Sequence, residues 1–260
     1  MLVQPDGAIV IAGTASIVGA FGISDGDFAA VRYTSSGALD AGFGNGGIAT
    51  INIAGRTDIA YAAVLQIDGK LVMTGRVANT GGDDPDIGLV RFDTNGIPDA
   101  TFGTGGIVRV TTPDWDEASD IVVQPDGSIV VSGFTIVGSS AMLTVARFDS
   151  AGASDAGFGT GGFLRDPVME RGRSLALQGD GQIVVAGSVG EYPGDMAVAR
   201  LNAIGALDTG FGESGLLRFD FFGGSDGANA VVIQADGKIV AGGYAVNGTQ
   251  MSLALIRVLP

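Results

Sequence analysis

The most constraining feature of this chain is a short phrase that recurs five times. Each copy is a glutamine, an Asp-Gly pair beginning two residues later, and a run rich in Val, Ile, Ala and Gly. The glutamines are Gln4, Gln66, Gln124, Gln178 and Gln234, at spacings of 62, 58, 54 and 56 residues. A period of this length predicts an array of repeated supersecondary units, so the repeat decides the fold before any single motif does.

Aligned on the glutamine, the copies predict four strands per repeat. The first strand precedes the glutamine, as in residues 60–66, and contains small residues. The Asp-Gly pair predicts a two-residue type I′ hairpin turn, after which the second strand begins. The third strand ends in an arginine and an apolar residue, as in Arg91-Phe92. A glycine turn and an Asp-x-x-Phe-Gly phrase then lead to the fourth strand, as in residues 48–53.

Four-stranded antiparallel units of this length, repeated around an axis, are typical of a β-propeller. The sequence therefore predicts an all-β fold with a single β-propeller domain over residues 1–260. Five blades are expected, at approximately 1–55, 56–113, 114–167, 168–223 and 224–260, the last without its outer strand. The alternative is an open β-solenoid, although solenoid repeats are usually shorter, about 20–30 residues.

Composition fits short strands and tight turns, and it excludes several classes of function. The chain has 45 glycines, only 8 prolines and 46% apolar residues, so it is not a disordered low-complexity sequence. A formal net charge of −14 disfavours nucleic acid and anionic membrane as partners. No apolar run approaches the roughly 18 residues that a membrane-inserted helix needs.

The absence of two residue types limits the chemistry further. Without cysteine there is no disulfide and no thiolate metal site. Without histidine there is no Ser-His-Asp or Cys-His catalysis and no histidine-bound zinc. The glycine-rich stretches match neither a phosphate loop nor a dinucleotide-binding fingerprint.

Three phrases recur across the whole chain: Q-P-D-G-x-I-V-V-x-G, A-R-F-D-x-x-G and D-x-x-F-G-x-G-G. In these phrases the chain resembles the delta-60 repeat family, a β-propeller repeat of unknown function from large bacterial surface and secreted proteins. The resemblance implies a propeller in a secreted or cell-surface setting, and it implies no catalytic residues. Departures are mild, since Gly179 and Ala235 replace the proline and Ser214 replaces one glycine. No signal peptide is visible, and the parent protein could be longer.

Strand alternation predicts two different ends for each blade. The Asp-Gly hairpins, the Arg-apolar pairs and the Asp-x-x-Phe-Gly phrases fall at one end, which we name the repetitive end. The connections from the second strand to the third, and from the fourth strand to the next blade, fall at the opposite, variable end. Variable loops on a rigid scaffold are where binding sites usually lie.

One position at the variable end recurs as an acid. It lies eight residues before the repeat glutamine and is occupied by Asp58, Asp116, Glu170 and Asp226. If the first strand is innermost, these carboxylates ring the mouth of a central channel and could hold Ca²⁺, which prefers several oxygen ligands. The alternative is that each acid caps a turn or pairs locally.

Two aromatic residues are candidates for ligand binding at the variable end. Trp115 adjoins Asp116 and Glu117, and Tyr192 lies in a Glu-Tyr-Pro-Gly loop. An aromatic ring beside acids is typical of sugar sites, although a Trp packed under a loop is the more common arrangement. The acidic loop 82–86 lies at the same end; it could bind a cation, but a solvated loop is the expectation.

The arginine that ends the third strand and the aspartate of Asp-x-x-Phe-Gly are interpreted as framework. They occur in every complete repeat at similar spacing, whereas a catalytic residue is normally needed once. We expect polar contacts that stabilise each blade, with the phenylalanine packed between blades.

These observations favour a non-catalytic binding or scaffold module that recognises a glycan or a protein through its variable-end loops. The alternatives are a glycoside hydrolase, for which Asp116 and Glu170 would be the paired carboxylates, and a purely structural spacer. The missing fourth strand of the last blade leaves an unpaired edge, which predicts either contact with the first blade or a homo-oligomer through that edge.

Overall fold

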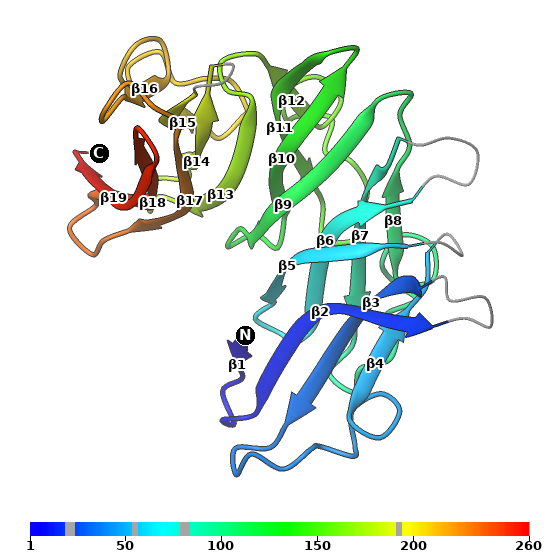
Figure 1. The fold of residues 1–260 in the computed structure, drawn as a ribbon. Helices are drawn as coiled ribbons and strands as arrows, with labels where there is room; N and C mark the ends of the chain where they lie inside the picture. Colours follow the sequence, from blue (N-terminus) through cyan, green and yellow to red (C-terminus); the bar gives the residue numbers. More distant parts are fainter. Residues whose placement is uncertain (19–23, 54–56, 79–83, 191–193, 260) are drawn as a thin grey trace. The chain divides into compact units, whose positions relative to one another are not determined.

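The computed structural model describes residues 1–18, 24–53, 57–78, 84–190 and 194–259. Their secondary structure is entirely β, in five antiparallel sheets of which the last has three strands (Figure 1). This confirms the predicted all-β, five-bladed propeller class with a three-stranded last blade. Among the described residues there is no helix that could cross a membrane. The chain divides into two compact units, residues 1–123 with 150–153 and residues 124–149 with 154–260. The prediction that all five blades form one domain is not tested by this division.

The first unit holds two complete blades and the first strand of the third repeat. In each blade the strands follow one another in sheet order, as a four-stranded meander. The first blade consists of β1 (Leu2–Val3), β2 (Ile9–Val18), β3 (Ser24–Tyr33) and β4 (Ile48–Ile51). The second blade and the following strand are β5 (Ile59–Leu65), β6 (Leu71–Val77), β7 (Asp86–Phe92), β8 (Ile107–Val110) and β9 (Trp115–Val123).

The second unit continues the same pattern. It contains β10 (Ile129–Val137), β11 (Ser140–Phe148) and β12 (Phe163–Asp166), followed by β13 (Arg171–Leu177), β14 (Ile183–Val189), β15 (Asp195–Leu201) and β16 (Leu216–Phe219). The last blade consists of β17 (Asp226–Ile233), β18 (Ile239–Asn247) and β19 (Gln250–Val258). Among the described strands β19 pairs only with β18, so it is the edge of its sheet.

Consecutive blades within a unit pack face to face, and this packing forms the core. In the first unit Phe28 and Ala30 of the first blade are buried in one cluster with Met73 and Val90 of the second. Both faces of a central strand are therefore covered, and all seven residues of β7 are buried. This explains why such strands read as nearly continuous apolar runs rather than as an alternating pattern.

The hairpin turns differ in detail from the predicted type I′ form. Only the glycine of each Asp-Gly pair has a positive φ, for example +83° at Gly7, and the aspartates do not. The Gly7 N–H donates to the carbonyl of Gln4, and the Asp6 carboxylate accepts the N–H of Ala8 at 2.9 Å. The turn is thus a four-residue Gln-Pro-Asp-Gly unit, in which proline suits the second position and glycine the left-handed fourth.

The first strand of three blades contains a β-bulge, which explains its small residues. The register shifts between Ala60 and Ala62, between Gly172 and Ser174, and between Ala228 and Ala230. Opposite the bulge, a backbone carbonyl oxygen of the first strand lies very close to a glycine of the second strand. An ideal Cβ on Gly187 would lie 1.8 Å from the Arg171 oxygen, so only glycine fits there.

Candidate functional site

The repetitive end of each complete blade is built from one recurring Arg–Asp–Phe cluster. The arginine Nε donates to the aspartate of Asp-x-x-Phe-Gly, and the guanidinium lies over the phenylalanine ring of the same phrase. In blades one to four the Nε–Oδ2 distances are 2.7 Å for Arg32–Asp40, 2.8 Å for Arg91–Asp99, 2.7 Å for Arg147–Asp155 and 2.8 Å for Arg200–Asp208. The guanidinium carbons lie 4.4–4.8 Å from the ring centroids of Phe43, Phe102, Phe158 and Phe211.

This cluster also binds the following repeat. The Nη1 groups of Arg32, Arg91 and Arg147 donate to the carbonyls of Thr94, Ser150 and Ala203 at 2.6, 2.5 and 2.7 Å. The phenylalanine packs on the turn glycine of the next repeat, so that a Cβ on Gly96 would lie 2.9 Å from the Phe43 ring. The arginines and aspartates therefore join blade to blade, as expected for framework residues.

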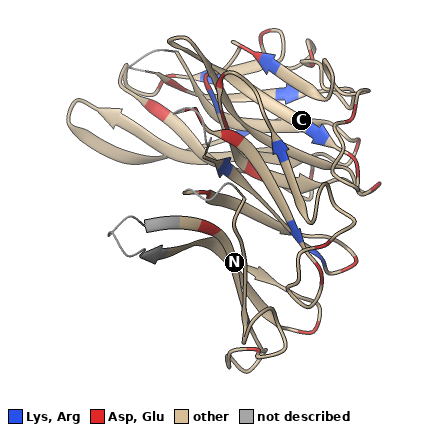
Figure 2. Ribbon diagram, turned by 90° about the vertical axis from the view of Figure 1, so that its right-hand side faces the viewer, with Lys and Arg blue, Asp and Glu red and all other residues tan. Residues whose placement is uncertain are grey.

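The pKa of the cluster aspartate is lowered in the first three blades. The N–H of Gly42 and the Arg32 guanidinium lower the pKa of Asp40. The N–H of Gly157 and the guanidinium of Arg147 do the same for the pKa of Asp155, against a smaller opposing effect of burial. In Figure 2, where lysine and arginine share one colour, these residues lie mostly on strands, and every described arginine belongs to a strand.

At the variable end, the acids found eight residues before the glutamine hold the blade connections in place. Asp58 accepts the backbone N–H of Ile53 at 2.9 Å and that of Ala78 at 3.1 Å. Asp226 accepts the N–H groups at the same offsets, from Phe221 at 2.9 Å and Val246 at 3.2 Å. Both aspartates are buried. The geometry favours the local capping role for these two residues.

The other two acids of this row also take part in local hydrogen bonds. Asp116 is buried and accepts a short hydrogen bond from the Thr112 hydroxyl, while its own N–H donates to the Pro85 carbonyl at 2.8 Å. Glu170 is half-buried, and its N–H donates to the Ser188 carbonyl at 3.1 Å. Whether the four acids form a ring around a channel stays a prediction, as does their pairing in catalysis.

A second row of acids at the variable end lies in the third strands, five residues before the repeat arginine, and sequence reasoning missed it. Its buried members are Asp27, Asp86 and Asp195. Asp27 accepts the Asn52 amide at 2.6 Å, and Asp86 accepts Arg109 Nε at 2.6 Å. Asp86 was expected in the solvated loop 82–86, but it is a buried strand residue with an ion pair. The signal was its offset of five residues before the repeat arginine, as in Asp27 and Arg32.

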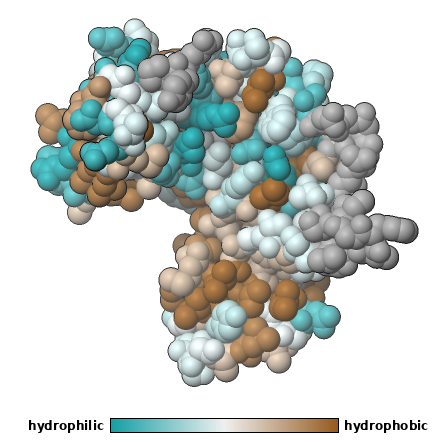
Figure 3. Space-filling view, in the orientation of Figure 1, coloured by the Kyte–Doolittle hydropathy of each residue, from teal (hydrophilic) through white to brown (hydrophobic). Residues whose placement is uncertain are grey.

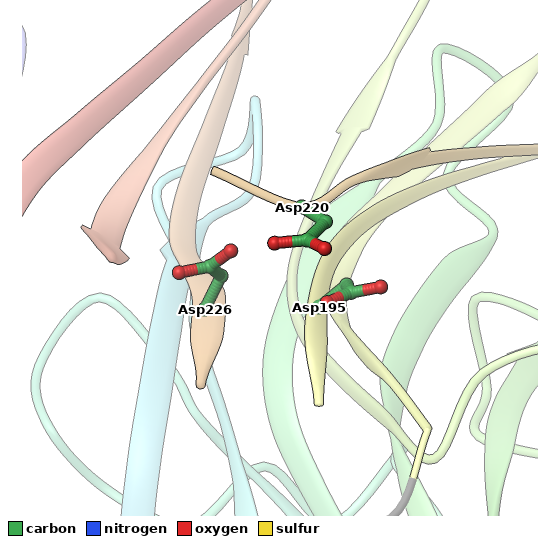
Figure 4. Close-up of side chains that lie close together, drawn as sticks. All are labelled: Asp195, Asp220 and Asp226. Carbon is green, nitrogen blue, oxygen red and sulfur yellow. The ribbon is translucent and has the colours of Figure 1, made fainter. Parts of the chain in front are cut away.

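Where the fourth blade meets the fifth, the two rows meet in a cluster of three carboxylates. Asp195, Asp220 and Asp226 each offer an oxygen within 4.8 Å of the others, and Figure 4 shows their side chains close together. Asp195 is paired with Arg218, which lies in β16. Asp220 directly follows that strand, in the place that Asn52 occupies after β4. An aspartate therefore stands where the first blade has an amide donor.

This cluster lies beside a hollow along β16. The hollow has a volume of about 660 Å³ and is lined by Val189, Asp195, Gly212, Glu213, Leu216, Leu217, Arg218 and Asp220. Three acids and one arginine give it a net negative charge, while the leucines give it an apolar wall. Such an arrangement can bind a hard cation through carboxylate oxygens or a polar ligand through hydrogen bonds.

The predicted aromatic residues do not join this hollow in the described part of the structure. Trp115 is half-buried at the start of β9, and its Nε1 is covered and has no hydrogen-bond partner. This fits a ring packed under a loop better than an exposed sugar platform. Tyr192 lies outside the described residues.

The fold and the two kinds of blade end define a repeat β-propeller with a framework end and a variable end. The chain belongs to the family described as "Domain of unknown function (DUF5122) beta-propeller", whose model matches residues 4–43, 66–102, 124–158, 178–211 and 234–260. These five segments begin at the five repeat glutamines. No curated protein sequence matches the chain.

Among solved structures the likeness extends to the fold alone. Sqt1 of Chaetomium thermophilum is 14% identical at a TM-score of 0.43, over 96% of this chain and 66% of that one. Sucrose-6-phosphate hydrolase of Lactobacillus gasseri is 11% identical at a TM-score of 0.42, over 94% and 52%. A Bombyx mori β-fructofuranosidase in complex with sucrose is 14% identical at 0.41, over 96% and 54%. The chain thus spans less than two thirds of each of these proteins.

Proposed function

We propose that this protein is a non-catalytic binding module of a secreted or cell-surface bacterial protein, which recognises a glycan or a protein through the variable ends of its blades. The proposed contact site is the variable-end part of the acidic hollow along β16, where Asp195, Arg218 and Asp220 supply polar contacts. The extracellular and bacterial setting rests on the family resemblance.

The lengths of the connections between strands carry this proposal. At the repetitive end every hairpin has five residues, namely 4–8, 66–70, 124–128, 178–182 and 234–238, and every connection to a fourth strand has fourteen, namely 34–47, 93–106, 149–162 and 202–215. At the variable end the hairpin connections 19–23, 78–85, 138–139, 190–194 and 248–249 have five, eight, two, five and two residues. The connections between blades, 52–58, 111–114, 167–170 and 220–225, have seven, four, four and six.

Constant lengths are expected at the repetitive end, because each repeat contacts the next there through an Arg–Asp–Phe cluster. Varied lengths are expected where the scaffold presents surface to a partner. At its variable end the hollow of the fourth blade is lined by one recurring and one individual acid. Asp195 belongs to a row of acids that recurs between blades, whereas Asp220 does not recur in the first blade. A shared frame therefore carries an individual polar site.

A glycan array followed by titration of any bound oligosaccharide or protein tests this proposal. We expect binding without release of reducing sugar, and we expect Asp220→Asn to weaken it about ten-fold, since a hydrogen bond to a charged group contributes about 1.5–3 kcal/mol. Asp180→Asn is the matched control, because Asp180 lies in the hairpin at the opposite end of the same blade. Equal affinities of Asp220→Asn and Asp180→Asn for the ligand would show that the hollow is not part of the binding site.

The reducing-sugar measurement distinguishes the non-catalytic binding module from the alternative, a glycoside hydrolase. Turnover that is lost in both Asp116→Asn and Glu170→Gln would establish the hydrolase and overturn the non-catalytic proposal. Folded protein that binds neither glycan nor protein would instead favour a structural spacer.

Calcium is proposed as a ligand of the variable end, through the predicted set Asp58, Asp116, Glu170 and Asp226. Asp226 also belongs to the carboxylate cluster where the fourth blade meets the fifth. About 10 mM CaCl₂, roughly ten times a weak extracellular Kd of about 10⁻³ M, is expected to raise stability by about 1.4 kcal/mol. Asp220→Asn, which restores the amide found in the first blade, should raise the Tm without calcium and abolish the calcium response. No change in the wild-type Tm at millimolar Ca²⁺ would contradict the proposal.

A further inference from the structure

The hollow beside β16 follows an unpaired strand edge. β16 pairs with β15 on one side, and no strand in the described part of the chain pairs with its other side. Successive side chains of a strand point to opposite faces. The hollow is lined by Leu216 and Arg218 from one face of β16 and by Leu217 from the other, and all of its lining residues belong to the second unit. The hollow therefore runs along the edge of the strand.

A hollow of the same kind lies along β12 in the third blade. It has a volume of about 520 Å³, and its residues 159–160 and 163–165 hold the repeat positions of 212–213 and 216–218. Its wall also includes Gly205 and Ala206, which belong to the glycine turn of the following repeat. The hollow is thus present where the next repeat lies beside it, and it is a property of the fourth strand in both blades.

The two hollows differ in charge. Among the described residues, no acid lines the hollow of β12, whereas Asp195, Glu213 and Asp220 line that of β16. Asp195 forms an ion pair with Arg218. Glu213 precedes β16 and Asp220 follows it, and both are exposed. After the arginine is counted, the hollow of β16 keeps a net negative charge, which is carried at the two ends of the strand.

The wall between the two exposed acids is apolar. It is formed by the half-buried side chains of Leu216, Leu217 and Val189. β16 has four residues, which gives the strand between the acids a length of roughly 13 Å at about 3.3 Å per residue. Figure 3 shows hydrophilic and apolar residues intermingled on the visible surface of the fourth and fifth blades. A ligand that matches this hollow is extended, positively charged at both ends and apolar between them.

The backbone of the edge favours a strand as this ligand. An edge strand presents N–H and C=O groups to a further strand. Next to the repetitive end a turn uses such groups, since the Glu213 N–H donates to the Leu216 carbonyl at 2.7 Å and the Leu216 N–H donates to the Glu213 carbonyl at 3.3 Å. A further strand would therefore pair with the edge between Leu217 and Phe219. In strand addition, main-chain hydrogen bonds give affinity and side-chain pockets give specificity.

We propose that the hollow of β16 binds an extended segment of a partner protein in which two basic residues flank a short apolar stretch. The segment adds a strand to the edge of β16, its basic residues contact Glu213 and Asp220, and its apolar residues cover Leu217. The inference rests on the proposed function, because it names the partner for the contact site proposed there. A glycan needs no positive charge at these acids, so the charge of the ligand distinguishes the two classes of partner.

Fluorescence anisotropy with two labelled peptides, Gly-Lys-Val-Thr-Val-Lys-Gly and Gly-Glu-Val-Thr-Val-Glu-Gly, tests the charge. We expect the lysine peptide to bind and the glutamate peptide not to bind. Glu213→Thr should weaken binding of the lysine peptide about two- to five-fold, the range of an exposed ion pair. This variant keeps the turn, because threonine holds the position in the third blade, where the Thr160 N–H donates to the Phe163 carbonyl at 2.7 Å. Asp180→Asn is the control, since it also removes one exposed negative charge, and it should leave the affinity unchanged.

A second pair of lysine peptides tests the added strand. In each peptide alternate backbone nitrogens are methylated, so that only one of its two edges keeps N–H groups. One of the two should bind as the unmodified peptide does and the other should lose binding, and equal binding of both would overturn the strand addition.

The charge experiment has two outcomes that contradict the proposal. One is equal binding of the lysine and glutamate peptides at up to about 1 mM protein, and the other is a Glu213→Thr variant that binds as the Asp180→Asn control does. Glycan binding that Asp220→Asn weakens, without binding of the lysine peptide, would overturn the inference and leave the proposed function intact.

Discussion

Gly187→Ala should destabilise the protein by about 3 kcal/mol or more, the upper range for inserting a group into packed structure. The new Cβ would lie 1.8 Å from the Arg171 carbonyl oxygen and 3.2 Å from Met169. The obstacle is backbone on a bulged strand, so a rotamer change cannot relieve it. The measurement is urea unfolding followed by circular dichroism, with separate midpoints for each transition.

Gly13→Ala is the matched control for this substitution. Gly13 occupies the same repeat position in the first blade, but nothing lies within 4 Å of its ideal Cβ and its φ is not positive. Its replacement should change stability by no more than about 0.5 kcal/mol, and the lower entropy of the unfolded chain could make the change favourable. If the two variants unfold at the same urea concentration, the close approach of the carbonyl does not constrain the residue.

The repeat position of Gly187 shows which parts of the fold could be predicted from the sequence. Repetition predicted the blades, their strands and the two kinds of blade end, because each copy provided an independent alignment of the same pattern. The alignment contained glycine at residues 75, 187 and 243, but it did not indicate why. The reason is a bulge in the paired strand, which depends on a register shift that no local pattern reveals.

The candidate site was only partly predictable for a related reason. Counting back from the glutamine found Asp226, which the structure places beside Asp195 and Asp220. Asp195 is found by a different count, five residues before the repeat arginine Arg200. Asp220 does not recur in the first blade at all, where Asn52 stands in its place. A search for recurring residues finds mainly framework positions. A residue that occurs in only one repeat has to be found from its neighbours in the structure.

The hairpin turn shows the converse error. The Asp-Gly pair predicted a type I′ turn, which needs positive φ at both residues. The proline of Gln-Pro-Asp-Gly suits the second position of a type I turn, and the aspartate then binds the N–H two residues ahead, as Asp126 does with Ser128 at 2.9 Å. A four-residue reading of the phrase would have predicted the observed turn.

The largest effect of a charge change is expected at Arg91. This residue is buried and joins Asp99 at 2.8 Å, the Ser150 carbonyl at 2.5 Å and Thr101 at 3.1 Å, with its guanidinium 4.6 Å from the centre of the Phe102 ring. Arg91→Met keeps the length of the stem but removes the guanidinium, so that the Asp99 carboxylate keeps only the ion pair with Lys70 at 3.0 Å. Loss of one member of a buried ion pair destabilises by about 3–5 kcal/mol.

Arg257→Met is the matched control, since Arg257 holds the same repeat position in β19 and is exposed. Its replacement should change the free energy of unfolding by less than about 0.5 kcal/mol. If Arg91→Met is no more destabilising than Arg257→Met, the Arg–Asp–Phe cluster does not stabilise the blade junction. Adding Asp99→Asn to Arg91→Met should recover part of the loss, because the buried charge is then removed.

Acidification should weaken the same clusters. Burial alone would raise the pKa of Asp99, but hydrogen bonds from the Thr101 hydroxyl and N–H and from Lys70, with the charge of Arg91, outweigh it and hold that pKa below the usual range. The carboxylate therefore adds stability above its unfolded pKa of about 3.9, and this contribution is lost as the pH falls through the lower folded value. Wild-type stability should decline from about pH 5 downward, and Asp99→Asn should show a shallower decline over the same range. Identical pH profiles for the two proteins would show that Asp99 titrates alike in the folded and unfolded chains, and that its ionised form does not hold the second blade to the third repeat.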